Sequence, residues 1–363
     1  MDRVEDNINK LLSGQTFEEP NQYCDFTIAD QNEATVARGV TPSVPSDFVP
    51  KLHKTICYVV AAILVNEKNE VLMIQEAKSS CAGQWYLPAG CLDQNEDIED
   101  AVIREVKEET GLDMKPTTLL MVQSTADGWM RFVFTGKIVG GTLKTPADAD
   151  DHSIQAKWID NIDELDLRKD DIYPIVDQCR NYIHHVNKAG GAVAAEARDL
   201  EGADDCAFDW HPNLLPIRKS HKKLYLRVVI CVRKRSNNRV HVLLSEKNEI
   251  HLPMCELNPV HSTHNTFKKY MMEIFGADLP THRPHGLICM EHKAKLSGNE
   301  DPKVEIENDG LCLTLLVSVR DALEDVGIID KYTWLEVSES LGQRLLNRLA
   351  RNMTVYLGPP KRA

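Results

Sequence analysis

Seven positions between residues 90 and 111 combine residue types that suit the chemistry of phosphate groups. They are Gly90, Glu96, Arg104, Glu105, Glu108, Glu109 and Gly111. Glu105, Glu108 and Glu109 stand at positions i, i+3 and i+4, so a helix places their carboxylates on one side. Each such like-charge pair would cost an isolated helix about 0.2–0.5 kcal/mol. A hard divalent cation removes this cost, and oxygen-only ligands predict Mg²⁺, with Mn²⁺ as the alternative.

The other positions of this pattern predict how the carboxylates are held. Arg104 lies one helical turn before Glu108 and can keep that carboxylate in place. Gly90 lets the loop before the helix pass close to a metal ion or ligand, because it has no side chain. Glu96, near the start of the helix, would anchor this loop or bind a second metal ion. The expected metal ligands are Glu105, Glu109 and Glu108, and the expected catalytic groups are Glu108, Arg104 and Glu96.

Residues 97–110 show the periodicity of an amphipathic helix that carries these groups. Its apolar side consists of Ile98, Val102, Ile103 and Val106. Gly111 provides the C-cap, and acidic residues in the first turn interact favourably with the helix dipole. Strands are predicted at residues 56–65, 71–75, 119–123, 131–139 and 156–159, with a closing helix at residues 172–186. This order predicts an α/β fold, an α/β/α sandwich with the acidic helix on one side.

Composition limits the partners and the location of the protein. The 363 residues are enough for two domains, and the net charge of −13 argues against duplex nucleic acid or an anionic membrane as a partner. A metal ion can still supply positive charge for a phosphate substrate. The ten cysteines form no CxxC pair, which predicts reduced thiols in the cytoplasm, with the nucleus as the alternative location. The longest apolar run, residues 56–65, is too short to span a bilayer, and the first residues lack a signal-peptide pattern.

Several segments resemble one known family. The spacing from Gly90 to Gly111 matches the Nudix box, and the chain is similar to the eukaryotic 8-oxo-dGDP phosphatase family within the Nudix hydrolases. The resemblance also rests on Cys81 and on residues 60–63, 69–78, 85–90, 131–134 and 141–145. It covers residues 50–185 well and the second half weakly. It implies Mg²⁺-dependent removal of the terminal phosphate from oxidised purine nucleoside diphosphates, namely 8-oxo-dGDP and 8-oxo-GDP.

The same resemblance implies roles for individual residues. Gly90, Glu105 and Glu109 match positions of the family's metal site. Leu72 matches a contact in the slot for the base. Asp171 matches an aspartate that reads the purine edge in a related hydrolase of oxidised purines. The expected substrate-binding residues are therefore Leu72, Gly90 and Asp171, while Cys91 departs from the larger polar residue that relatives often carry.

The second half of the chain repeats this pattern without its chemical groups. Pro88 lies 23 positions before Gly111, and Pro253 lies 23 positions before Gly276. The counterparts of the acidic, basic and first glycine positions are Cys255, His261, Lys269, Tyr270, Glu273 and Ile274. Since only Glu273 keeps a carboxylate, this half is predicted to be a degenerate Nudix-like α/β domain, with an unrelated α+β domain as the alternative.

The expected organisation follows from this repeat and from local composition. Residues 1–50 are expected to form a mostly flexible N-terminal segment, in which a short helix near residues 8–12 is the main periodic pattern, and residues 51–188 a catalytic Nudix domain. Residues 189–206 are expected to be a linker, because they are rich in Gly, Ala and acidic residues. Residues 207–350 would form the degenerate domain, and residues 351–363 a C-terminal tail.

Three hypotheses of function stay open at this point. The first is the phosphatase of oxidised nucleotides, and the second is a Nudix hydrolase of ADP-ribose, a dinucleoside polyphosphate or a capped nucleotide. The third is a nucleotide-binding scaffold whose second domain recruits an unknown protein partner; the complete box argues against it. The general base could be Glu108 or a side chain of the acidic loop at residues 148–152, for which a polar hairpin tip is the favoured interpretation.

Overall fold

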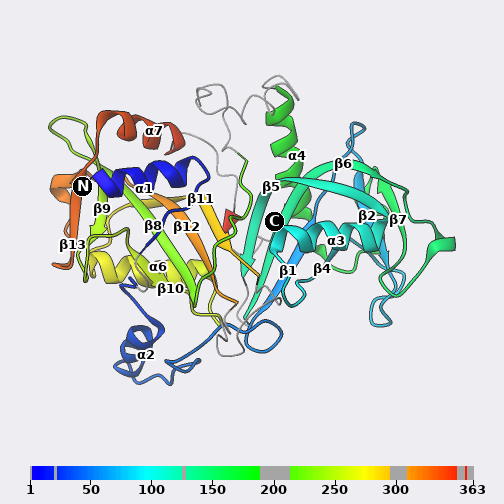
Figure 1. The fold of residues 1–363 in the computed structure, drawn as a ribbon, viewed down its shortest axis with the longest axis horizontal. Helices are drawn as coiled ribbons and strands as arrows, with labels where there is room; N and C mark the ends of the chain where they lie inside the picture. The colour runs from blue at the N-terminus through cyan, green and yellow to red at the C-terminus, as the bar shows by residue number, and fades with distance from the viewer. Residues whose placement is uncertain are drawn as a thin grey trace. The chain divides into compact units, whose positions relative to one another are not determined.

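The chain consists of two units in the computed structural model, which describes residues 2–19, 23–124, 128–188, 213–294, 309–349 and 356–357 (Figure 1). The box unit, which contains the acidic helix, comprises Cys57–Gln123, Met130–Leu215 and Thr354–Ala363. The repeat unit comprises Met1–Ile56, Ser124–Trp129 and Pro216–Met353. Each unit has strands and helices of its own.

The box unit contains two sheets and two long helices (Figure 1). Its strands are β1 (Cys57–Ala62), β2 (Val71–Glu76), β3 (Trp85–Tyr86), β4 (Ala89–Cys91), β5 (Leu112–Ser124), β6 (Trp129–Gly141) and β7 (Ser153–Ile159). Its helices are α3 (Ile98–Thr110) and α4 (Tyr173–Lys188). One sheet has the order β14-β5-β6-β1-β4, where β14 is Tyr356–Leu357, and the other has the order β3-β2-β7. The short strand β14 lies in the segment that was expected to be a tail.

The two helices cover opposite faces of these sheets, because successive side chains of a strand point to opposite sides. On one face, Ala61 and Met73 pack with Ile175 of α4 in one apolar cluster. On the other face, α3 contacts β1, β4 and β7. Its Val102 and Val106 are fully buried. The predicted α/β/α sandwich is therefore confirmed.

The repeat unit contains the same kinds of elements in the same order. Its strands are β8 (Leu224–Arg233), β9 (Val240–Ser245), β10 (Met254–Glu256), β11 (His282–His292), β12 (Leu311–Val319) and β13 (Tyr332–Glu336). Its helices are α1 (Asp2–Leu12), α2 (Ile28–Val36), α6 (Thr263–Phe275) and α7 (Glu339–Leu349). The sheet has the order β11-β12-β8-β9-β13, and β10 pairs with β8. This arrangement matches β5-β6-β1, β2-β7 and β4 of the box unit.

The strand registers show that the two units correspond residue by residue. Val60 pairs with Gly90 in the box unit, as Leu226 pairs with Cys255 in the repeat unit. The backbone N–H of Ala62 donates to the carbonyl of Pro88 at 2.9 Å, and Val228 donates to Pro253 at 2.9 Å. Leu72 faces Trp158 and Leu243 faces Trp334 in the same way. The second half is therefore a second sandwich built on the first pattern, as expected from the Leu-Pro spacing.

The structure does not agree with a flexible segment at residues 1–50. Helix α1 lies next to α7 on one face of the repeat-unit sheet, with α6 on the other face (Figure 1). Ile8 and Leu11 are fully buried in a cluster with Leu341 and Leu345 of α7. Arg348 Nη2 donates to the carbonyl of Leu12 at 2.7 Å. The segment is ordered because its apolar side is completed by a helix more than 300 residues away, a contact that has no local signature.

Two further expectations concern membrane-spanning segments and the segments that connect or follow the two units. Among them, no helix has both the length and the apolar character needed to cross a membrane. The predicted linker at residues 189–206 lies outside the described residues, and so does the C-terminal segment apart from β14.

Candidate functional site

Two glutamates of helix α3 lie on its buried side. It ends at Gly111, whose φ of 75° lies in the left-handed region that glycine adopts without strain. Glu105 and Glu109 are only 7% and 3% exposed, whereas the side chain of Glu108 is 35% exposed. Ile103, expected on the apolar side, is only half-buried. The buried side of the helix therefore includes two of the carboxylates, which the apolar periodicity alone did not indicate.

Arg104 connects three of the carboxylates to one another. Its Nε and Nη2 donate to the two oxygens of Glu96 at 2.7 and 2.8 Å. Its Nη1 lies 2.8 Å from Glu105 Oε1 and 3.0 Å from Glu108 Oε2, so the expected contact with Glu108 is present. Glu96 also accepts a hydrogen bond from the backbone N–H of Asp93 at 3.0 Å. Glu96 is thus positioned as an anchor for the loop before α3.

The loop before α3 approaches the same carboxylates through its backbone. The N–H of Ala89 donates to Glu109 Oε2 at 2.8 Å. The carbonyl of Cys91 accepts from Arg104 Nη2 at 3.0 Å. A Cβ atom at Gly90 would collide with the carboxylate of Glu105. Glycine is therefore required at position 90 by a close approach between the strand and the helix.

Glu105 and Glu109 are buried near each other, and neighbouring groups compensate their negative charge only in part. Burial raises the pKa of Glu105, against the neighbouring Arg104 guanidinium, which lowers it. Burial also raises the pKa of Glu109 well above its usual value; the N–H of Ala89 opposes this shift, and the carboxylates of Glu105 and Glu76 add to it. A set of converging carboxylate oxygens of this kind fits a hard divalent cation. Glu105 and Glu109 would bind it. Glu108 is exposed enough to act as a third ligand or as a group that orients water.

Other residues close to this site were not expected from the box. Glu76 is 2% exposed and binds Arg168 Nη1 at 2.6 Å. Lys144 Nζ donates to the backbone carbonyl of Glu108 at 3.0 Å, and Ser153 Oγ donates to that of Glu109 at 2.6 Å. Glu76 and Lys144 lie in segments that carry the family resemblance, whereas Ser153 lies outside them and outside the box.

The acidic loop at residues 148–152 is a structural turn. Asp150 Oδ1 binds Lys144 Nζ at 2.5 Å and accepts from the N–H groups of His152 and Ser153 at 2.9 and 3.1 Å. Asp148 accepts from the N–H of Thr145 at 3.0 Å. These bonds use the carboxylates of Asp148 and Asp150 locally, which favours the hairpin-tip interpretation over a general base from either of them.

Two residues expected to contact substrate lie in different surroundings. Leu72 is fully buried in β2, the central strand of its sheet, so it offers no exposed surface to a base. The burial of Leu72 therefore does not agree with the expected direct contact between this side chain and the base. Asp171 is bound by two buried partners: Tyr86 donates to its Oδ1 at 2.8 Å, and Arg131 Nη2 lies 3.1 Å from its Oδ2. Asp171 therefore belongs to a polar cluster that crosses β3 and β6.

The corresponding place in the repeat unit is closed by the N-terminal segment. Tyr270 and Ile274, which replace Glu105 and Glu109, are fully buried. The hydroxyl of Tyr270 donates to Asp25 Oδ2 at 2.9 Å, and so does the backbone N–H of Met254 at 2.9 Å. Met254 corresponds to Ala89, so Asp25 accepts the bond that Glu109 accepts in the box unit. The remaining carboxylate, Glu273, forms an ion pair with Lys331 at 2.5 Å.

Asp25→Ala is expected to lower the free energy of unfolding of the repeat unit by about 3 kcal/mol. The substitution leaves the Tyr270 hydroxyl and the Met254 N–H buried without their acceptor. Calorimetric unfolding of the full chain measures the effect. Asp278→Ala, at an exposed position of the same unit, serves as the control and should change stability by less than about 0.5 kcal/mol. An equally small change in Asp25→Ala would contradict a structural role for this carboxylate.

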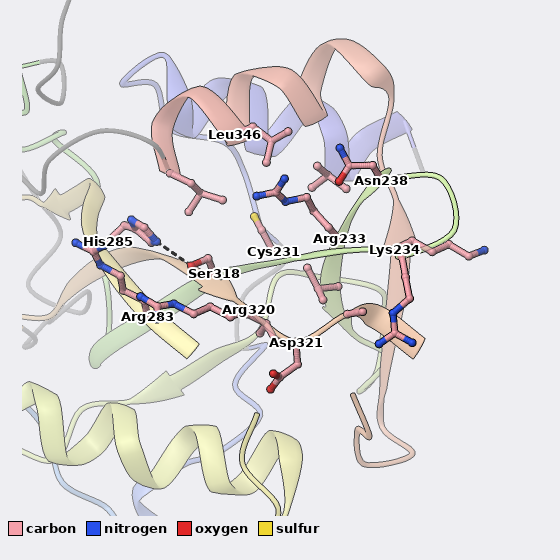
Figure 2. Close-up of a pocket in the computed structure, with 16 residues that line it drawn as sticks. Cys231, Arg233, Lys234, Asn238, Arg283, His285, Ser318, Arg320, Asp321 and Leu346 are labelled. Atoms are coloured by element: carbon pink, nitrogen blue, oxygen red, sulfur yellow. Dashed lines mark hydrogen bonds between the residues drawn. The ribbon is translucent and has the colours of Figure 1, made fainter. Parts of the chain in front are cut away.

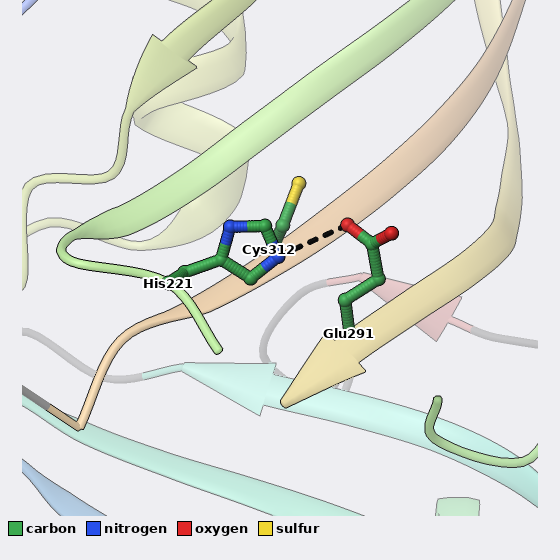
Figure 3. Close-up of side chains that lie close together, drawn as sticks. All are labelled: His221, Glu291 and Cys312. Atoms are coloured by element: carbon green, nitrogen blue, oxygen red, sulfur yellow. Dashed lines mark hydrogen bonds and ion pairs between the residues drawn. The ribbon is translucent and has the colours of Figure 1, made fainter. Parts of the chain in front are cut away.

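A second group of residues with metal-ligand chemistry lies in the repeat unit (Figure 3). His221, Glu291 and Cys312 each place one ligand atom within 4.8 Å of the others. Glu291 is already bound by His221 Nε2 at 3.0 Å and Arg227 Nη2 at 3.2 Å, with Lys219 Nζ at 3.6 Å. Burial alone would raise the pKa of Glu291, but Arg227 and His221 hold it well below its usual value. Arg227 and Lys219 thus compensate the charge of Glu291 in place of a metal ion.

This ion-pair cluster instead fixes the N-terminal segment to the sheet. Thr16 Oγ1 donates to Glu291 Oε1 at 2.5 Å. Arg227 Nη2, fully buried, also binds Glu19 Oε2 at 2.6 Å. Removing one partner of such a buried pair would leave an unpaired charge in the core. The cluster is therefore a structural part of the repeat unit.

Comparison with known proteins agrees with this geometry. Residues 56–178 match the model of the NUDIX domain. The 8-oxo-dGDP phosphatase NUDT18 of Danio rerio is 30% identical over 358 residues, which cover 95% of this chain and 94% of the relative. The proteins of the same name from Mus musculus and Homo sapiens are 32% and 33% identical, and the alignments cover 85% and 84% of this chain and 89% and 88% of the relatives. Because these relatives align along most of their length and the box residues converge in space, the chain belongs to the Nudix hydrolase family.

Proposed function

We propose that this protein is a Mg²⁺-dependent hydrolase that removes the terminal phosphate of oxidised purine nucleoside diphosphates. The substrates would be 8-oxo-dGDP and 8-oxo-GDP, each hydrolysed to its monophosphate and inorganic phosphate. The observation that carries the proposal is the alignment over 94% of a relative named 8-oxo-dGDP phosphatase, together with the complete set of box residues around Arg104. The reaction would keep damaged purines out of the nucleotide pool. The cytoplasmic location expected from the cysteines stays a prediction.

Nudix hydrolases generally use divalent metal ions, and Mg²⁺ held by Glu105 and Glu109 would neutralise charge on the phosphate oxygens. Mn²⁺ would suit the same oxygen ligands. Glu108, the most exposed of the three glutamates, would orient the attacking water and accept its proton. The water oxygen bonds to the β-phosphorus, and the bond from that phosphorus to the bridging oxygen breaks. Arg104 would keep Glu105 and Glu108 in position throughout.

The polar cluster around Asp171 supports a role in recognising the base. Arg131, which binds Asp171 through Nη2, is itself held in place, since its Nε donates to Gln123 Oε1 at 2.6 Å and its Nη1 to the Tyr86 hydroxyl at 2.6 Å. Because Asp171 has buried partners, its orientation is fixed before substrate binds. In this proposal Asp171 contacts the purine edge, and Arg131 and Tyr86 position it. Leu72 would act indirectly, by packing beneath the site.

A panel of nucleotides tests the proposed substrate class. With Mg²⁺, we expect kcat/KM for 8-oxo-dGDP to exceed that for dGDP and for 8-oxo-dGTP by at least about tenfold. An 8-oxo purine has a carbonyl at C8 and a hydrogen-bond donor at N7, and a site that pairs with them discriminates against a base that lacks them. Phosphate release is measured for each compound, with ADP-ribose hydrolysis followed in parallel. Equal rates on dGDP and 8-oxo-dGDP, or a clear preference for ADP-ribose, would contradict the proposal.

A further inference from the structure

A cavity of about 570 Å³ lies in the repeat unit, away from the closed position around Asp25. It forms where the C-terminal ends of the parallel strands β8 and β12 meet the first residues of β11 (Figure 2). Leu346 and Leu349 of α7 complete its wall. Its volume falls within the roughly 300–1,000 Å³ of small-molecule sites, and ligands commonly bind at the carboxyl ends of parallel strands.

Three arginines from different strands border this cavity. Arg233 ends β8, Arg283 is the second residue of β11, and Arg320 directly follows β12. In the part of the chain that the structure describes, no acidic side chain pairs with any of the three. By contrast, Arg235 in the adjacent turn is bound by Asp325. Unpaired cationic groups are therefore concentrated here in a protein whose net charge is −13.

The neutral polar groups of the cavity lie beside these arginines. His285 Nε2 and Ser318 Oγ are 2.8 Å apart, and Figure 2 shows Arg283 and Arg320 next to this pair. Burial lowers the pKa of His285 to about 4, and the charges of Arg283 and Arg320 add to this effect. His285 is thus a neutral hydrogen-bonding group at pH 7. Asp321, an acidic residue of the lining, accepts from the N–H of Thr281 at 2.7 Å.

Part of the cavity wall is apolar. Its surface comes from Cys231 and Val240 of the sheet and from Leu346 and Leu349 of α7. A ligand that fits this site therefore has a phosphate or a similar anion at one end and an apolar, ring-sized part at the other. The limited volume favours a small molecule, and the overall negative charge disfavours an anionic membrane surface.

We propose that this cavity of the repeat unit binds a nucleoside phosphate, with its phosphate on Arg283 and Arg320 and its nucleoside against the apolar part of the wall. Guanidinium groups bind phosphate through paired, charge-assisted hydrogen bonds. The degenerate domain would thus keep a nucleotide-binding role at a place different from the acidic site of the box unit. This site does not depend on the substrate proposed above.

Calorimetric titration of the full chain with GMP and with pyrophosphate tests this proposal. The titrations use the Glu105→Gln variant in EDTA, so that metal-dependent binding in the box unit does not contribute. We expect Arg283→Gln and Arg320→Gln each to weaken binding of both compounds by about tenfold, the effect of losing one charge-assisted hydrogen bond. Arg38→Gln removes an exposed arginine of the same unit outside the cavity, and it should leave both affinities unchanged.

Comparing GMP with pyrophosphate distinguishes binding of the nucleoside from binding of the phosphate. If the apolar side accepts the nucleoside, GMP binds more tightly than pyrophosphate, and Leu346→Ala weakens GMP while pyrophosphate is unaffected. Thermal unfolding of each variant verifies that the repeat unit is still folded. The proposal is overturned if neither compound binds, or if the Arg283 and Arg320 variants bind like Arg38→Gln.

Discussion

Glu105→Gln and Glu109→Gln are each expected to lower turnover by about a thousandfold or more, while the fold is kept. Each substitution removes one negative charge from the proposed metal site, and a metal ion in such a site contributes several kcal/mol to transition-state stabilisation. Glutamine has nearly the same shape as glutamate, so position 109 can still accept the N–H of Ala89. Phosphate release at saturating Mg²⁺ measures the effect.

The repeat unit supplies a matched control for this experiment. Glu273 occupies the position of Glu108 in α6, but it is paired with Lys331, and Tyr270 and Ile274 replace the other two carboxylates. Glu273→Gln should therefore leave turnover unchanged. Activity within tenfold of the wild type in Glu105→Gln or Glu109→Gln would show that the assigned metal site is wrong. A loss of activity in Glu273→Gln would show that the repeat unit takes part in the reaction.

Gly90→Ala is expected to lower turnover by about a hundredfold with little change in stability. The added Cβ would occupy the place of the Glu105 carboxylate, which must move away from its bond with Arg104. Because the end of a glutamate side chain moves easily, the fold adapts while the carboxylate loses its position. A displacement of about 1 Å in a catalytic group can cost a factor of this size. Measurement of kcat together with the unfolding temperature separates the two effects.

The control for this substitution is a glycine with free space around it. A Cβ at Gly327 would meet no atom within 4 Å, so Gly327→Ala should leave both kcat and the unfolding temperature unchanged. Raising the Mg²⁺ concentration should restore part of the activity of Gly90→Ala, because the ligands are displaced and still present. If Gly90→Ala had wild-type activity, the close approach between β4 and α3 would have no catalytic importance.

The sequence determined the features that depend on local periodicity. The i, i+3, i+4 spacing of Glu105, Glu108 and Glu109 predicted a helix with grouped carboxylates, and Gly111 predicted its end. Strand patterns around this helix predicted the α/β/α sandwich. The equal spacing of the two Leu-Pro motifs from their helix-ending glycines predicted a second copy, and the paired registers of Leu72 with Trp158 and Leu243 with Trp334 agree with it.

Contacts between residues far apart in the chain follow from the tertiary structure. Asp25 lies 245 residues from Tyr270, whose hydroxyl it binds. Arg233, Arg283 and Arg320 lie far apart in the chain and line one cavity because β8 and β11 both pair with β12. The burial of Leu72 depends on strands and helices that cover it from both sides. Such contacts produce no periodic pattern in the sequence, because the order of strands and the packing of side chains determine which groups come into contact. The chemistry of the box could therefore be predicted from the chain, whereas the closed site of the repeat unit and its basic cavity could not.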